Sequence, residues 1–177
     1  TMEGWLAERP KPPSAQELKL RLKLFLALCD AVNYAHLRGV IHRDLKPANV
    51  IILEGSGESS MGDRGPTLKV LDFGLARLLE LEGEGASPRT EAGVVMGTLQ
   101  YMSPEQARGQ SDAIDVRTDV YALGVILYEL VLGRRPYELG KGGLTEALRV
   151  VCETPPMKWD RSWNQSRRPE GDLWTIV

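Results

Sequence analysis

The fold of this chain is decided by residues 40–52, which read VIHRDLKPANVII, and by residues 69–74, which read KVLDFG. Each stretch places charged or amide side chains directly beside a run of apolar residues. Apolar runs are typical of buried backbone, whereas charged and amide groups are costly to bury without partners. The two stretches therefore indicate a functional site built next to a buried core.

The polar residues of these stretches have the chemistry that phosphoryl transfer needs. That reaction requires an acceptor hydroxyl in line with the phosphate and cations beside the oxygens that gather charge. Asp44 offers a carboxylate that can orient a hydroxyl and accept its proton, and Lys46 offers a point charge for the phosphate. Asn49 and Asp72 offer hard oxygen ligands for Mg²⁺ beside substrate phosphates. A single Asp in a loop is more often a turn or cap residue, so only the joint pattern indicates catalysis.

The order His-Arg-Asp-Leu-Lys, then Asn49, then Asp-Phe-Gly resembles the catalytic loop and the metal loop of protein kinases. Lys two residues after Asp is similar to Ser/Thr kinases rather than Tyr kinases. Residues 97–107 (GTLQYMSPEQA) and 119–124 (DVYALG) are most similar to bacterial Ser/Thr kinases. The resemblance implies an α+β, mainly helical, kinase-like large lobe with a short β-hairpin at the catalytic and metal loops. It also implies ATP and Mg²⁺ as cofactors and a protein substrate.

The resemblance assigns roles to individual residues of this chain. It implies that Asp44 and Lys46 are catalytic. It also implies that the nucleotide is bound by Lys46, Asn49, Ile51 and Asp72, and the metal ion by Asn49 and Asp72. Structural support of the site falls to His42, Arg43, Phe73, Gly74, Glu105 and Asp119. Asp119 is the residue that the family uses to hold the catalytic-loop backbone.

Residues 75–96 are too polar and Gly-rich to hold themselves rigid, and by position they are the activation loop of the family. Thr90 is the expected phosphosite, and Ser87 is the competing one. A phosphate adds about −1.5 to −2 charge and is able to pair with Arg43. Thr98 is expected to face the substrate, where its hydroxyl can bridge Asp44 and Lys46.

Local signals predict the main helices. Ser14 and Glu17 have the form of a capping box, and a helix is expected to follow and to close at Gly39. Its apolar stripe comprises Leu18, Leu22, Phe25, Cys29, Val32 and His36. Residues 119–132 are apolar nearly all round, which predicts a central core helix because the run is too short to span a bilayer. Residues 144–152 predict one more short helix.

Strands are predicted at 50–53 and 67–71, joined by the Gly- and Ser-rich tip 54–66. Ser103 before Pro104 predicts the start of a short helix that runs to Arg108. We interpret His36 and His42 as structural histidines rather than ligands.

Composition limits the classes of partner. The 22 basic and 24 acidic residues leave a net charge of −2, which provides no basic field for nucleic acid or anionic lipid. Trp159, Trp163 and Trp174 lie among arginines and are read as packing residues rather than as a nucleic-acid platform. Cys29 and Cys152 are read as small buried apolar side chains. Without a signal peptide or a membrane segment, a reduced cytoplasmic setting is expected.

We expect residues 1–177 to form a partial kinase domain, cut at both ends. The Gly-rich loop, strand Lys and helix Glu that the family places upstream do not occur in the sequence, so the small lobe of the same kinase is expected before Thr1, and this chain alone is expected to be inactive. The family's Arg partner of Glu105 is expected beyond Val177.

Three alternative functions remain. A pseudokinase scaffold usually loses Asp44, Asn49 or Asp72, and all three are present. A small-molecule kinase would lack Lys46-Pro47 and the Ser-Pro-Glu step. A plain helical interaction domain would not explain the joint motif.

Overall fold

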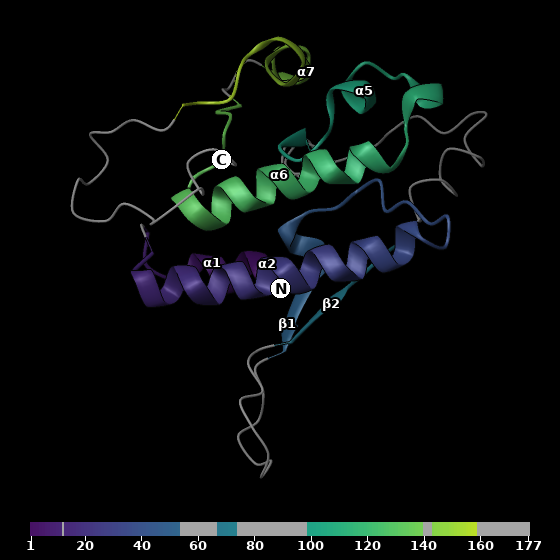
Figure 1. Ribbon diagram of the computed structural model, residues 1–177. Helices are drawn as coiled ribbons and strands as arrows, with labels where there is room; N and C mark the ends of the chain where they lie inside the picture. The colour runs from purple at the N-terminus through teal and green to yellow at the C-terminus, as the bar shows by residue number, and fades with distance from the viewer. Residues whose placement is uncertain (12, 54–66, 74–98, 140–142, 159–177) are drawn as a thin grey trace.

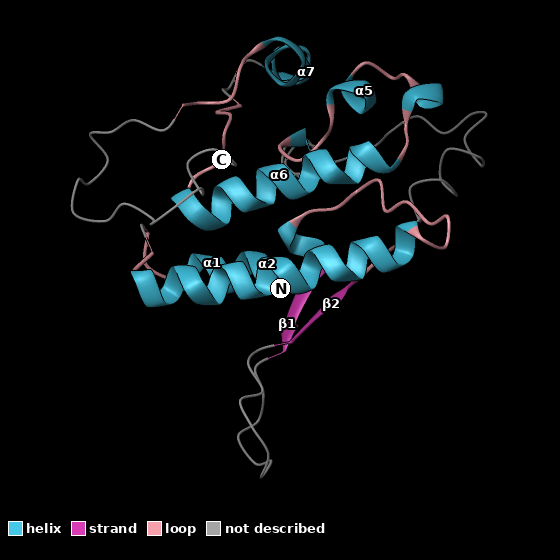
Figure 2. Cartoon of the chain, viewed as in Figure 1, coloured by secondary structure: helices cyan, strands magenta, loops and turns pink. Residues whose placement is uncertain are grey.

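Two long helices run side by side through the middle of the computed structural model (Figure 1). The structure describes residues 1–11, 13–53, 67–73, 99–139 and 143–158. Its elements are α1 (Met2–Ala7), α2 (Ala15–His36), η1 (Pro47–Asn49), β1 (Val50–Leu53), β2 (Thr67–Val70), α5 (Pro104–Ala107), η2 (Ser111–Ala113), α6 (Val116–Leu132) and α7 (Gly143–Glu153). The described chain is mostly helical with one two-stranded sheet (Figure 2), as predicted.

Helix α2 begins and ends near the predicted residues. The Ser14 hydroxyl accepts the N–H of Glu17 over 3.2 Å, but the Glu17 carboxylate bonds Arg9 and Arg21 instead of returning to Ser14. The prediction that the Glu17 side chain bonds back to Ser14 is therefore wrong. At the other end, Gly39 has φ 74°, its N–H bonds the carbonyl of residue 36, and the N–H of residue 40 bonds the carbonyl of residue 35. This pair of bonds is the glycine-closed helix end that was predicted.

The predicted apolar stripe of α2 is displaced from the buried face. The most buried line consists of Arg21, Leu24, Leu28, Val32 and Ala35. Only Val32 belongs to both sets. The predicted residues Leu18, Leu22 and Phe25 instead pack, partly buried, against a smaller cluster at the end of α6. Apolar periodicity does not detect this buried line because it counts apolar residues alone, and Arg21, which belongs to the line, is charged.

Helix α1 was not predicted. Thr1 caps it, and the helix buries Met2, Trp5 and Leu6 in the main core. The prolines at positions 10, 12 and 13, which would break a helix, lie after its last residue and do not oppose it. The core that it joins also contains side chains of α2, β1 and α6 and the catalytic-loop residue Leu45.

Helix α6 starts earlier than predicted and is less completely buried. Asp115 caps it by accepting the N–H of Arg117 over 2.8 Å, and Gly133, at φ 67°, ends it. Ten of its residues are buried, but Val116 and Val120 are 41% and 56% exposed. The helix is thus exposed along one side near its N-terminus, and the expectation that it is buried on nearly all sides is wrong there. Among the described helices, none combines the length and the hydropathy needed to cross a membrane.

The hairpin brings the two polar stretches together. β1 pairs antiparallel with β2, with Val50 opposite Val70, and the N–H of Leu71 donates to the carbonyl of Asn49 over 2.8 Å. The strand ends therefore place the residues before Asp72 beside the end of the catalytic loop. The predicted tip at 54–66 and the Trp-containing stretch at 159–177 lie outside the described residues.

The remaining short helices agree with the sequence. Ser103 and Gln106 form a complete capping box at α5, with Pro104 at the first helical position, and α7 covers the predicted residues 144–152.

The two cysteines differ from the prediction. Cys29 and Cys152 are free thiols and only half-buried, so the interpretation of both as buried side chains is wrong. Burial, followed by the charge of Asp30, raises the pKa of Cys29.

Candidate active site

Asp119 anchors the catalytic loop from the first turns of α6. Its side chain is 1% exposed, and its two carboxylate oxygens accept the N–H of His42 at 2.8 Å and the N–H of Arg43 at 2.9 Å. His36, from the end of α2, bonds the same carboxylate at 2.7 Å. The sequence suggested a structural role for His36 without indicating its partner.

His42 joins the catalytic loop to the second polar stretch. Its ring is buried, Nδ1 accepts the N–H of Asp44 at 3.3 Å, and Nε2 lies 2.8 Å from the carbonyl oxygen of Leu71. Because Nδ1 accepts, the proton resides on Nε2 and is donated to Leu71. The ring also packs against that of Phe73, with the centroids 4.8 Å apart and the planes tilted by 56°. His42 therefore couples the position of Asp44 to that of the residues around Asp72.

Asp44 is held with one carboxylate oxygen engaged. Lys46 Nζ lies 2.8 Å from Asp44 Oδ2. Asn49 Nδ2 donates to the Asp44 carbonyl at 2.8 Å and to Oδ2 at 3.2 Å. Oδ1 has no donor within the described ranges, and 34% of the side chain is exposed. The geometry thus leaves one carboxylate oxygen able to accept a hydrogen bond from an incoming hydroxyl.

Two site residues other than glycine have left-handed backbone conformations. Arg43 has φ 67° and Asp72 has φ 59°. Such values are uncommon for residues with a side chain and persist where surrounding contacts enforce them. Around Arg43 these contacts are visible: Asp119 holds its N–H, and Gln106 Nε2 donates to its carbonyl over 2.6 Å.

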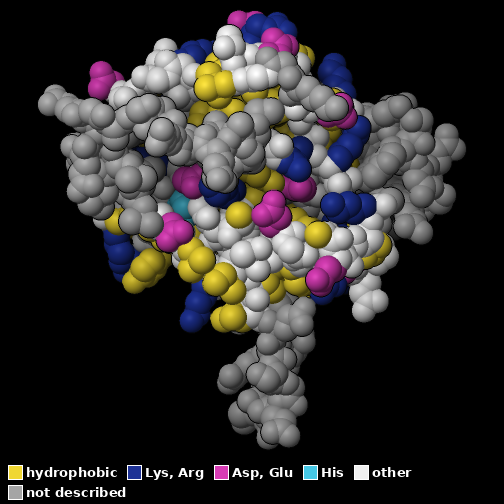
Figure 3. Space-filling view, turned by 180° about the vertical axis from the view of Figure 1, so that it is seen from behind, with side chains coloured by type: hydrophobic (Ala, Val, Ile, Leu, Met, Phe, Trp, Pro, Cys, Tyr) yellow, Lys and Arg dark blue, Asp and Glu magenta, His cyan; other side chains and the backbone are white. Residues whose placement is uncertain are grey.

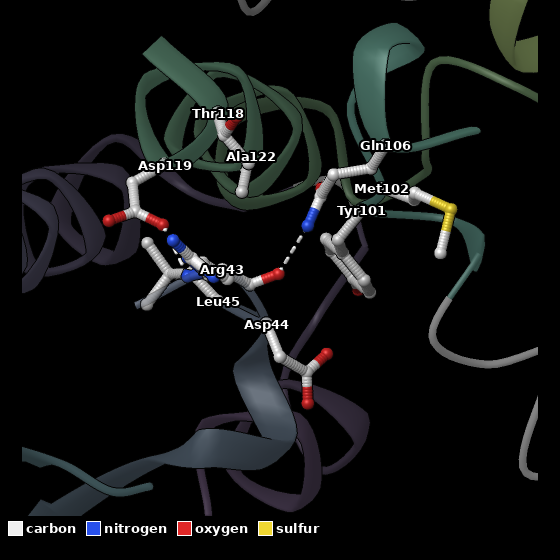
Figure 4. Close-up of a pocket in the computed structure, with 9 residues that line it drawn as sticks. All are labelled: Arg43, Asp44, Leu45, Tyr101, Met102, Gln106, Thr118, Asp119 and Ala122. Carbon is white, nitrogen blue, oxygen red and sulfur yellow. Dashed lines mark hydrogen bonds between the residues drawn. The ribbon is translucent and has the colours of Figure 1, made fainter. Parts of the chain in front are cut away.

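A pocket lies between the catalytic loop and the helices α5 and α6 (Figure 4). It is lined by Arg43, Asp44, Leu45, Tyr101, Met102, Gln106, Thr118, Asp119 and Ala122. Figure 4 shows Gln106 reaching the Arg43 carbonyl while the Asp44 carboxylate points away from α6. Sequence reasoning missed Gln106 and Thr118. The Ser-x-x-Gln spacing could have predicted the helix cap, but it does not indicate that Gln106 contacts the catalytic loop.

Glu105 is held by α6. The hydroxyl of Thr118, which is buried, donates to Glu105 Oε1 over 2.8 Å. Burial alone would raise the pKa of Glu105, but hydrogen bonds from its backbone and from Thr118 outweigh burial, so the pKa lies below its ordinary value. The resemblance implies an Arg partner for Glu105 beyond Val177; among the described residues, Thr118 contacts this carboxylate.

Tyr101 is fixed beside the pocket. Its hydroxyl donates to Glu129 over 2.5 Å, and Arg135 lies 3.8 Å from the same carboxylate. Burial and the adjacent Glu129 carboxylate raise the pKa of Tyr101 well above its ordinary value. The phenol therefore stays protonated and acts as a hydrogen-bond donor at neutral pH.

Charges of both signs are spread over the surface. On the face seen in Figure 3, acidic and basic side chains lie interspersed among hydrophobic ones. This mixture agrees with the small net charge of −2.

The predicted site residues are only partly brought together by direct contacts. His42, Arg43, Asp44, Lys46, Asn49, Phe73 and Asp119 share the bonds and the ring contact described above. Glu105 joins them only through α5 and α6, Ile51 lies half-buried on β1, and Asp72 is exposed at the end of β2. Gly74, Ser87, Thr90 and Thr98 lie outside the described residues, as does the whole activation-loop stretch 75–96.

The residues present fit a magnesium ion that is shared with substrate phosphates. Asn49 uses Nδ2 for both of its side-chain bonds, which leaves Oδ1 as a ligand. Asp72 follows the residue whose N–H bonds the Asn49 carbonyl. Within the described ranges, no three His, Cys, Asp or Glu side chains form a metal cage. Mg²⁺ commonly binds one or two protein oxygens together with phosphates and water, so two oxygen ligands suffice.

A family model described as a protein kinase domain matches residues 5–172. The chain belongs to the protein kinase family. It is 46% identical over 110 residues to the serine/threonine-protein kinase Pkn1 of Myxococcus xanthus, which covers 62% of this chain and 14% of that protein. It is 43% identical over 138 residues to the probable serine/threonine-protein kinase CE0033 of Corynebacterium efficiens, covering 77% and 18%. With PknB of Mycolicibacterium smegmatis the identity is 40% over 134 residues, covering 76% and 19%.

The recognition of a bacterial-type Ser/Thr protein kinase from the sequence is confirmed by these matches. The chain spans between about a seventh and a fifth of the length of these curated relatives.

Proposed function

We propose that the protein carrying this chain is a serine/threonine protein kinase and that residues 1–177 contain its catalytic loop. The reaction is transfer of the γ-phosphate of ATP to a Ser or Thr hydroxyl of another protein. One observation carries the proposal: the Asp44 carboxylate is held at Oδ2 by Lys46 at 2.8 Å and by Asn49 at 3.2 Å, while Oδ1 accepts no hydrogen bond from the described residues and 34% of the side chain is exposed. The names of the similar bacterial proteins support the same activity.

The proposed step balances with the groups of this site. The substrate hydroxyl donates its hydrogen bond to Asp44 Oδ1, and its oxygen forms the new bond to the γ-phosphorus. The bond between that phosphorus and the β,γ-bridging oxygen breaks, ADP leaves, and the hydroxyl proton passes to Asp44. Lys46 stabilises the negative charge that gathers on the transferred group.

The residues that we assign to nucleotide and metal binding lie in or beside the hairpin formed by β1 and β2. We place Asn49 and Asp72 as the protein ligands of Mg²⁺, which when bound neutralises charge on the β- and γ-phosphates. Ile51 is proposed to contact the nucleotide, Thr98 to face the substrate, and Thr90 to be the phosphosite that pairs with Arg43.

The test measures phosphate transfer by the full-length gene product to a library of Ser- and Thr-containing peptides. Asp44→Asn is expected to lower kcat by about 10² to 10⁴ with little change in ATP affinity, because the variant loses the proton acceptor. Asp72→Ala is expected to abolish Mg²⁺-dependent ATP binding. The matched control is Asp112→Asn, an exposed carboxylate in η2.

Turnover of Asp44→Asn equal to that of the unmodified protein would contradict the assignment of Asp44. A full-length protein that binds ATP without transferring phosphate would instead favour the scaffold function.

A further inference from the structure

The peptide unit that joins Arg43 to Asp44 is held at both of its polar groups. Its carbonyl oxygen accepts from Gln106 Nε2 at 2.6 Å, and its N–H, which belongs to Asp44, donates to His42 Nδ1 at 3.3 Å. The orientation of this unit sets the direction in which the Asp44 side chain leaves the backbone. Since the preceding residue has φ 67°, the orientation depends on contacts that outweigh the local preference.

Gln106 uses its two amide atoms for different tasks. Its Oε1 accepts from the N–H of Ser103 at 3.1 Å and lies 3.3 Å from the Ser103 hydroxyl. The N–H of Ser103 can only donate, so the amide oxygen must face it, and the amide nitrogen must face the Arg43 carbonyl. A capping box accepts either Glu or Gln at this position, but only Gln also provides a donor for that carbonyl.

We propose that Gln106 is a positioning residue for Asp44. Its side chain ties the N-terminus of α5 to the catalytic loop, 63 positions earlier in the chain, and it holds the carbonyl of Arg43, whereas Asp119 holds the N–H of the same residue. The link to turnover rests on the proposed kinase function, whereas the structural coupling does not.

Two substitutions separate this role from helix capping. Gln106→Glu keeps the cap acceptor and the side-chain size but loses the donor to Arg43. Ser103→Ala removes the hydroxyl that accepts the Gln106 N–H at 3.4 Å and leaves the contact between Gln106 and Arg43 in place. Ser103→Ala is therefore the matched control.

The first experiment measures amide hydrogen exchange by NMR in residues 1–177. Gln106→Glu is expected to speed exchange at Arg43 and Asp44 about tenfold, the effect of losing one hydrogen bond of ordinary strength. Ser103→Ala is expected to speed exchange in α5 and leave Arg43 and Asp44 within about twofold of their rates. If Gln106→Glu does not fold, Gln106→Met replaces it, because Met keeps the length and removes both polar atoms.

The second experiment compares turnover of the full-length gene product. Gln106→Glu is expected to lower kcat about tenfold with KM for ATP changed by less than about twofold, and Ser103→Ala is expected to change neither. Unchanged exchange at Arg43 and Asp44 in the Gln106 variants, or equal effects of the Gln106 and Ser103 substitutions, would overturn the proposal. If the unmodified full-length protein transfers no phosphate, the kinase proposal fails, and the exchange experiment still decides the role of Gln106.

Discussion

Thr118 connects two helices through a single hydroxyl. The hydroxyl donates to Glu105 Oε1 at 2.8 Å and is one of the groups that lower the pKa of that carboxyl. A carboxyl whose pKa is lower in the folded state stabilises the fold above its unfolded pKa, and this stabilisation is lost as the pH falls through the folded pKa. Glu105 thus contributes to stability at neutral pH and stops contributing in acid.

Thr118→Val is expected to move the pKa of Glu105 up toward its ordinary value of 4.5, because the variant keeps the shape of the side chain and loses the donor. The acid-induced loss of stability that Glu105 causes is then smaller and is complete at a higher pH, because the folded pKa lies closer to the unfolded one. The measurement is a carboxyl NMR titration between about pH 2 and pH 6. Thr118→Ser, which keeps a hydroxyl, is the control, and an unchanged pKa in Thr118→Val would contradict the role of this bond.

Between secondary-structure elements, Arg21 is a buried polar connector of the two long helices, in addition to the contact of His36 with Asp119. Its side chain is fully buried in α2. It donates to the carbonyl of Leu130 in α6 at 3.0 Å, to the carbonyl of Pro10 at 3.0 Å and to Glu17 at 3.1 Å. Each partner is an acceptor that would be left without this donor if Arg21 were replaced.

Arg21→Met is expected to lower the free energy of unfolding by about 3 to 5 kcal/mol, the range for removing one member of a buried ion pair. Chemical denaturation followed by far-UV circular dichroism measures the change. Lys19→Met lies on the exposed face of the same helix and is expected to change stability by less than about 0.5 kcal/mol. Equal effects of the two substitutions would show that Arg21 does not hold the helices together.

At the scale of the whole molecule, one core connects the site to its support. Buried residues of α1, α2, β1 and α6 form a single cluster that includes Leu45 of the catalytic loop. Ile126 of α6 is completely buried in this cluster. The loop is therefore supported by the same apolar contacts that hold the helices.

Ile126→Ala is expected to lower the free energy of unfolding by about 2 to 5 kcal/mol, because it removes buried methyl groups and leaves a cavity. Hydrogen exchange at Leu45 is expected to accelerate with exchange in α2, since both depend on one cluster. Val120→Ala, at a position that is 56% exposed, serves as the control. Exchange at Leu45 that stays unchanged while α2 is destabilised would contradict a shared core.

Local signals in the sequence were enough for most of the described elements and for the family. Ser14, Gly39 and the Ser103-Pro104 step predicted helix ends that the structure contains, because caps depend on the residues next to them. The apolar runs predicted the hairpin, and the joint motif around Asp44 predicted the family. Thr90 and Thr98 stay predictions, since they lie outside the described residues.

The contacts that position the site come from tertiary structure. His36 and His42 meet Asp119 across 83 and 77 positions, Gln106 meets Arg43 across 63, and Arg21 meets the Leu130 carbonyl across 109. Cap rules and periodicity describe neighbours within one or two helical turns, so they cannot predict contacts between residues this far apart in the sequence. The same limit explains why the burial of Arg21 could not be predicted: two of its partners are carbonyl oxygens, which every residue carries, and only the packing of the chain around α2 selects the ones it bonds.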